Sequence, residues 1–265
     1  MGQLAEGALR RYRAVTIAAL ALLALLAWAW LASGAGMAMG AKISLAPFPH
    51  REAPAHAMAM GWSLGRALLT FSMWWAMMVA MMLPAAASTI LLYARAAGHR
   101  APAGELSPPT AFFLAGYLIV WAFFSAGATG LQALLEQIGL VASGTMGSAS
   151  RWLSGGVLIA AGLYQLSPAK NACLSHCRSP AVFLSRHYRP GWAGAWRLGL
   201  IHGAYCLGCC WMLMVLLFVG GVMNHAWIAV LTLIVAAEKH LPSGPTIALI
   251  GGLTLLAWGA VTLAT

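Results

Sequence analysis

Charged side chains are scarce in this sequence. Asp, Glu, Lys and Arg make up only 8% of its 265 residues, whereas 62% of the residues are hydrophobic. A soluble domain carries about 25% charged residues, so this chain has too little polar surface to fold as a soluble globule. Its 15 basic residues outnumber its 5 acidic ones, but long apolar stretches separate them, whereas a nucleic-acid-binding protein gathers them on one face. The composition excludes both classes and indicates an all-α, polytopic membrane protein.

Carboxylates that could work as a catalytic pair are also missing. Only Glu136 and Glu238 fall at expected membrane borders, and no Ser/His/Asp pattern or glycine-rich phosphate loop occurs. General acid–base catalysis needs positioned titratable groups, and nucleotide binding commonly uses such a loop. We therefore do not expect an enzyme. No internal repeat or second soluble domain is evident, so residues 1–265 are expected to form a single integral membrane domain.

Seven apolar stretches are candidates for membrane helices, each of which needs roughly 20 residues. They cover residues 14–31, 68–93, 111–135, 152–167, 198–221, 223–237 and 246–264. The fourth and sixth are short, so six helices are the alternative. The first stretch follows basic residues and could be a cleaved secretion signal, but its length favours a retained anchor.

The distribution of Lys and Arg predicts the orientation in the membrane. With the N-terminus inside, the inner segments hold eleven basic residues and the outer ones only Lys42, Arg51, Arg66 and Arg151. Because inner loops are enriched in Lys and Arg, we expect a cytoplasmic N-terminus in a bacterial-type inner membrane. Residues 33–65 then form an outer loop that contains Met and His. Residues 168–197 form a basic inner loop, in which Lys170, Arg178 and Arg197 are interpreted as positive-inside anchors.

All five cysteines lie between positions 173 and 210, together with two histidines at helical spacing. Residues at i, i+3 and i+4 share one helix face. The two groups are Cys173, His176 and Cys177 in the inner loop, and His202, Cys206, Cys209 and Cys210 in the fifth stretch. If the two helical segments face each other, they can form a thiolate and imidazole metal site. Cys209 and Cys210 point about 100° apart on a helix, so both need not bind one ion.

Several roles are open to this cluster. Cysteine binds a metal as thiolate, and a bound cation offsets the cost of burying that charge. The alternatives are core packing, a thiol–disulfide oxidoreductase, and a structural Zn site, which Cys and His suit equally well. A permanent disulfide framework is disfavoured because five is odd and because the cluster lies on the reducing side. Glu238 and Lys239 are adjacent and do not face each other, so their partners are expected elsewhere.

Methionines follow the second stretch in two rows. Met73, Met77 and Met81 lie one turn apart, with Met78 and Met82 beside them, and Pro84 is expected to break the regular helical hydrogen bonding. Thioether sulfur is a soft ligand that suits Cu(I), although Met is also a common core residue. More Met and His lie in the outer loop, where they suit copper capture or occur by chance. They are Met37, Met39, His50, His56, Met58 and Met60. From outer Met and His to inner Cys and His, the donors form a series suited to stepwise exchange of Cu(I).

Two motifs carry a resemblance to a known family. The segments Pro168 to Pro180 (PAKNACLSHCRSP) and His202 to Met214 (HGAYCLGCCWMLM) resemble the family of predicted metal-binding integral membrane proteins. The methionine-rich second stretch, the Gly220 to Asn224 turn, and Glu238-Lys239 ahead of Pro242 are also similar. The resemblance covers most of the chain after about Leu64, with Ala169 where leucine is expected, and it does not include the outer loop.

The resemblance implies a membrane copper chaperone that loads copper enzymes such as tyrosinase-like oxidases. Together with the cluster, it predicts a Cu(I)-binding membrane protein that delivers copper to a cuproenzyme or metallochaperone partner, or across the bilayer. The predicted metal ligands are Cys173, His176, Cys177, His202, Cys206, Cys209, Cys210, Met73, Met77 and Met81. Membrane lipid is the other expected partner.

Overall fold

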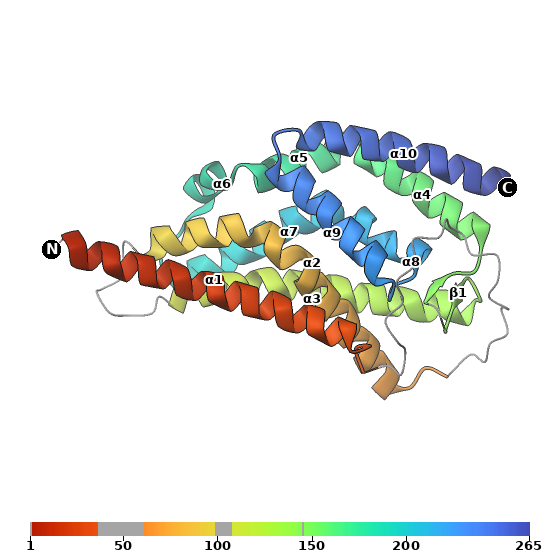
Figure 1. The fold of residues 1–265 in the computed structure, drawn as a ribbon, viewed down its shortest axis with the longest axis horizontal. Coiled ribbons are helices and arrows are strands. Elements are labelled where there is room, and N and C mark those ends of the chain that lie inside the picture. The colour runs from red at the N-terminus through yellow and green to blue at the C-terminus, as the bar shows by residue number, and fades with distance from the viewer. Residues whose placement is uncertain (1, 37–60, 99–107, 145) are drawn as a thin grey trace.

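The computed structural model describes residues 2–36, 61–98, 108–144 and 146–265, and this part of the chain is almost entirely helical (Figure 1). The long helices are α1 (Gly2–Ala32), α2 (Leu64–Gly98), α3 (Pro108–Gln137), α7 (Gly191–Val215) and α10 (Gly244–Ala264). The shorter ones are α4 (Arg151–Gln165), α5 (Pro168–Arg178), α6 (Pro180–His187), α8 (Leu217–Gly220) and α9 (His225–His240). Strands β1 (Val141–Ala142) and β2 (Gly147–Ser148) form a small antiparallel hairpin. The expected all-helical fold is thus confirmed apart from this hairpin.

Five segments are long and apolar enough to cross a membrane. They are Arg13–Ala32, Leu64–Ala97, Pro109–Gln137, Gly191–Gly220 and Gly244–Ala264. The expected fourth and sixth spans are present as α4 and α9, but with 15 and 16 residues each is about 24 Å long, short of the roughly 30 Å hydrocarbon core. The count of seven spans and the inward N-terminus therefore stay predictions. The outer-loop donors Met37, Met39, His50, His56, Met58 and Met60 lie outside the described residues.

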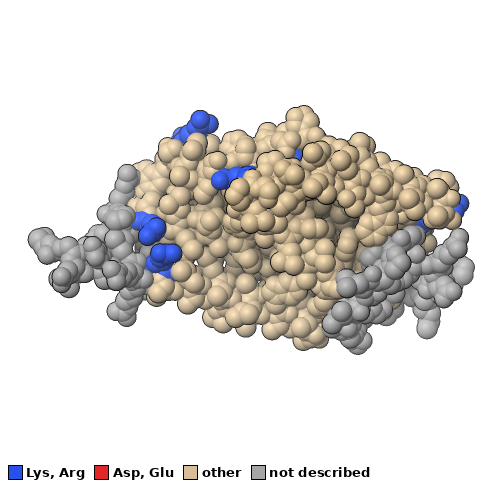
Figure 2. All heavy atoms as spheres, turned by 45° about the horizontal axis from the view of Figure 1, so that its top comes forward, with Lys and Arg blue, Asp and Glu red and all other residues tan. Residues whose placement is uncertain are grey.

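Apolar side chains cover much of the outer surface. Phe123 is 74% exposed, and Leu25 and Leu233 are nearly as open. In the face shown in Figure 2, Lys and Arg lie mainly toward one end and at the opposite tip, and no Asp or Glu is visible. A broad exposed apolar surface of this kind is typical of a lipid-facing protein.

Local signals explain why the segment expected as an inner loop is mostly helical. Ser167 accepts a hydrogen bond from the backbone N–H of Lys170, and Pro168 occupies the first turn of α5. Pro180 begins α6 in the same way. A serine N-cap followed by proline is a strong helix start because proline gives up no hydrogen bond at that position. In α2 the helix continues through Pro84, which has no N–H to donate to the preceding turn.

Small residues set the packing of α7, which lies against α3 and α5. A Cβ atom at Gly199 of α7 would overlap the carbonyl group of Phe113 in α3, and one at Gly116 of α3 would overlap the carbonyl of Trp196. Glycine therefore permits close backbone contact between these helices, as is common in membrane bundles. Helices α4 and α10 pack side by side (Figure 1) through a similar glycine face that contains Gly155 and Gly252.

Candidate metal site

The predicted donors of α5 all face α7. The Sγ atom of Cys177 lies 4.0 Å from Sγ of Cys209, and both residues are buried. Cys173, one turn earlier and half-buried, packs its sulfur against Gly208, where a Cβ would come within 2.7 Å. The 4-residue spacing on α5 thus places two thiols along one edge of α7.

His176 also faces α7, but its ring contacts an aromatic side chain. The imidazole stacks on Tyr205 with 4.1 Å between ring centroids and an interplanar angle of 4°. Its Nδ1 atom lies 2.8 Å from the carbonyl oxygen of Ala172. The ring is therefore held beside the cysteines by stacking and by one backbone hydrogen bond.

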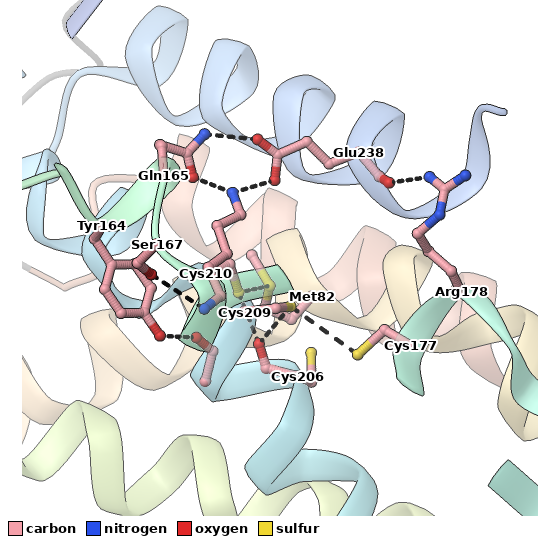
Figure 3. A network of polar contacts seen from close by, with 12 residues as sticks. Met82, Tyr164, Gln165, Ser167, Cys177, Arg178, Cys206, Cys209, Cys210 and Glu238 are labelled. Atoms are coloured by element: carbon pink, nitrogen blue, oxygen red, sulfur yellow. Dashed lines mark hydrogen bonds and ion pairs between the residues drawn. The ribbon is translucent and has the colours of Figure 1, made fainter. Parts of the chain in front are cut away.

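The three cysteines of α7 are buried and point to different neighbours (Figure 3). Cys209 meets Cys177 of α5, whereas the thiol of Cys210 lies 3.7 Å from Sδ of Met82 in α2. Cys206 contacts the hydroxyl oxygen of Tyr117 at 3.1 Å and Nζ of Lys239 at 2.9 Å. The sulfur atoms of Cys177, Cys206, Cys209, Cys210 and Met82, called the sulfur cluster below, thus join α2, α5 and α7.

The methionine that contacts a thiol belongs to the second row of α2. Met73, Met77 and Met81 are fully buried in the core, and so is Met82. The rotation of α2 about its axis turns Met82 toward Cys210. Sequence spacing defines the two rows but does not tell which of them faces α7.

His202 lies one turn before Cys206 in an aromatic pocket. Its ring centroid is 5.3 to 6.0 Å from the rings of Phe113, Tyr117 and Phe183. The residue is 3% exposed, and its Nδ1 atom has no hydrogen-bond partner among the described residues. In the tautomer that carries its proton on Nε2, this Nδ1 atom has a free lone pair that can bind a metal.

Two buried charged contacts fix the position of α5 against α9. Nζ of Lys170 donates to Glu238 at 2.6 Å and also to the side-chain oxygen of Gln165, whose amide nitrogen donates to the other Glu238 oxygen at 2.7 Å. Lys170 is fully buried, so its interpretation as a positive-inside anchor is wrong. The ammonium instead forms a buried ion pair with Glu238, which neutralises its charge.

The guanidinium of Arg178 also fastens this end of α5 to α9. It donates to the backbone carbonyls of Glu238 and Leu241 at 2.6 and 2.7 Å, and to that of Pro242 at 3.1 Å. The Glu238 carbonyl lies in the last turn of α9, where helical carbonyls lack a partner within the helix, and the carbonyls of Leu241 and Pro242 directly follow the helix. Arg178 is thus a structural clamp, a role that the charge distribution did not predict.

The environment of α5 keeps its thiols protonated in the metal-free protein. Burial raises the pKa of Cys173 above the usual thiol value, and the neighbouring Cys209 raises it further. The pKa of Cys177 is raised well above that value by its hydrogen bond with Cys209 and by burial. A metal that binds these residues must therefore displace protons.

Three residues of the site were not predicted: Met82 as the thiol-contacting methionine, and Tyr117 and Lys239 as partners of Cys206. Lys239 did carry a signal, because an ionisable residue next to an apolar stretch is a functional candidate in membrane proteins. Within the described part of the chain, no three His, Cys, Asp or Glu side chains are close enough together to form a preassembled metal-binding group. The sulfur pairs at 3.7 and 4.0 Å are the arrangement that the structure offers to a soft ion.

Comparison with known proteins identifies the family. No curated protein and no solved structure is significantly similar to the chain. A family model described as PpoB2, copper chaperone, matches residues 71–262, which is almost three quarters of the sequence. The match begins in α2, ends in α10 and includes all five cysteines as well as Lys239. The chain therefore belongs to the PpoB2 family of copper chaperones.

Proposed function

We propose that this protein is an integral membrane copper chaperone that carries Cu(I) in the sulfur cluster and passes it to a cuproenzyme. The observation that carries the proposal is the contact between Cys177 of α5 and Cys209 of α7, with Cys210 beside them against Met82. Residues far apart in sequence thus bring soft donors together inside an apolar helix bundle. The five apolar segments support the membrane location.

The donor types favour Cu(I) over harder or divalent ions. Thiolate and thioether are the ligands that select Cu(I). An ion held roughly 2.3 Å from each of two sulfurs separates them by at most about 4.6 Å, and the Cys177–Cys209 and Cys210–Met82 distances of 4.0 and 3.7 Å lie within that limit. A structural Zn site closes with four ligands, and the described residues hold no preassembled group of three.

The predicted donors divide into a holding site and a transfer route. We assign the holding site to Cys177 and Cys209, with Cys210, Cys206 and His202 as neighbouring donors. Cys173 and His176 lie on the same face of α5 but are more open, so they suit transfer to or from a partner at the inner side. The buried row of Met73, Met77 and Met81 suits passage from the outer side toward Met82.

Copper titration of the purified protein tests the holding site. Detergent-solubilised protein, reduced and metal-free, is titrated with Cu(I) in competition with a chromogenic Cu(I) chelator. Cys177→Ser and Cys209→Ser are expected to lose the tight site, because a hydroxyl is a poor ligand for a soft ion. Cys173→Ser is the matched control: it lies on the same helix and makes the same chemical change, and it should retain tight binding.

Each outcome separates the proposal from its alternatives. Unchanged Cu(I) stoichiometry and affinity in both Cys177→Ser and Cys209→Ser would overturn the site. Purification with bound zinc that Cu(I) does not displace would assign a structural zinc protein. Reversible loss of maleimide-reactive thiols on mild oxidation of metal-free protein, without tight Cu(I) binding, would favour thiol–disulfide exchange.

A further inference from the structure

Two lysines are buried in this part of the protein, Lys170 in α5 and Lys239 in α9, and they contact different partners. Lys170 pairs with the carboxylate of Glu238 at 2.6 Å. Lys239 follows Glu238 in the sequence, but its ammonium points to Cys206, with Nζ 2.9 Å from Sγ. Adjacent residues on a helix point about 100° apart, so the charge of Glu238 is directed away from Lys239 and is already neutralised by Lys170.

Lys239 has no carboxylate partner in the described part of the chain. The ion pairs there join Arg66 to Glu136 and Lys170 to Glu238. Lys239 is only 6% exposed, and an unpaired ammonium in a low-dielectric interior is costly. The neighbouring groups that favour its charged form are cysteines, with Cys206 the strongest, followed by Cys209, Cys210 and Cys177. Among the described residues, the cysteine sulfurs are thus the groups next to Lys239 that can supply a counter-charge.

We propose that Lys239 is the charge partner of the copper-loaded sulfur cluster and sets its net charge to zero. The inference rests on the proposed function, because it takes Cu(I) as the cargo. With Cys177 and Cys209 as thiolates and Cys206 as a neutral thiol, one monovalent ion leaves the cluster with a net charge of −1, and the ammonium of Lys239 cancels it. A neutral assembly is far less costly to bury than a charged one.

The same arithmetic makes Lys239 a specificity-determining residue. For a site of two thiolates, a divalent ion would leave the cluster and the ammonium with a net charge of +1, which nothing described nearby cancels. After copper leaves, the ammonium remains next to Cys206, so the emptied cluster keeps a cation beside its sulfur atoms. Lys239 acts through this fixed charge and does not itself bind the metal.

Substitutions at Lys239 separate charge from hydrogen bonding and from packing. Lys239→Met keeps most of the side-chain volume and removes the charge, Lys239→Gln keeps an N–H donor without charge, and Lys239→Arg keeps the charge. Lys239→Arg is therefore the matched control, because it changes the side chain at the same position without removing the charge next to Cys206. Each variant is purified as the full chain and checked for a single size-exclusion peak.

The readout is Cu(I) affinity by chelator competition, with Ag(I) as a second monovalent probe. Lys239→Met and Lys239→Gln should both weaken binding roughly 10- to 100-fold, because both lose the charge of the contact with Cys206 and charge-assisted contacts are typically worth about 1.5–3 kcal/mol. Lys239→Arg should stay within about threefold of the unmodified protein. X-ray absorption at the copper edge should show two sulfur ligands in the unmodified protein.

The outcomes distinguish this inference from the proposed function. Tight Cu(I) binding that is unaffected in Lys239→Met, or fully retained in Lys239→Gln, would overturn the charge role while leaving the copper site intact. Equal losses in Lys239→Arg and Lys239→Met would show that Lys239 serves packing and not charge. Absence of tight Cu(I) binding in the unmodified protein would instead refute the proposed function.

Discussion

Replacing Lys170 with methionine should strongly destabilise the protein, because it leaves a buried carboxylate without its cation. Lys170 donates to Glu238 at 2.6 Å, and the side chains of the pair are 0% and 2% exposed. Methionine fills a similar volume, so the main change is the loss of the ammonium. The carboxylate of Glu238 then keeps Gln165 as its side-chain partner, at 2.7 Å.

The magnitude follows from the burial of the pair. Breaking a buried ion pair by removing one partner costs about 3–5 kcal/mol. Water cannot screen the remaining charge at this depth, but the hydrogen bond from Gln165 remains, so we expect the lower end, about 3 kcal/mol. That loss corresponds to a change of roughly 100-fold in the unfolding equilibrium constant.

Equilibrium unfolding in mixed detergent micelles, followed by circular dichroism, measures this change. The double variant Lys170→Met/Glu238→Gln removes both charges and should recover most of the stability, since replacing a buried pair by uncharged residues is often nearly neutral. A single variant within about 0.5 kcal/mol of the unmodified protein would refute the reasoning. So would a double variant that is no more stable than the single one.

Two further predictions concern packing and thiol reactivity. Gly199→Ala places a Cβ against the Phe113 carbonyl and should lower the free energy of unfolding by about 1–3 kcal/mol in the same assay. Gly127→Ala in α3 is the control and should not destabilise the protein, because a Cβ there meets open space. Equal effects of the two substitutions would contradict the packing account. Because burial raises the pKa of Cys173 and thiolate is the reactive form, maleimide should label Cys173 more slowly than a free cysteine at pH 7, at a rate that rises about tenfold per pH unit. A rate independent of pH would argue against this environment.

The helical fold and the common face of the α5 donors follow from local patterns. The spacing of Cys173, His176 and Cys177 predicts a common helix face, and the structure turns that face toward α7. The caps at Ser167 and Pro168 explain why the helix begins there. These features depend on residues within one or two turns of each other, so sequence alone is informative about them.

The partners of individual side chains could not be predicted in the same way. Counting Lys and Arg by position placed Lys170 with the solvent-facing charges, because the count ignores Gln165 and Glu238, which meet it only after α5 and α9 pack. The choice of Met82 over Met81 depends on the rotation of α2, and a shift of one residue is about 100°. The contact of Lys239 with Cys206 likewise depends on how α9 approaches α7.

The sequence separation of the buried charges has a consequence for biosynthesis. Lys170 precedes Glu238 by 68 residues, and Cys206 precedes Lys239 by 33. A nascent chain emerges N-terminus first, so α5 and α7 are synthesised before either counter-charge exists. A ribosome-bound chain that stops before α9 has its cysteines but neither Glu238 nor Lys239. The proposed charge role of Lys239 therefore predicts that tight copper binding follows the completion of α9.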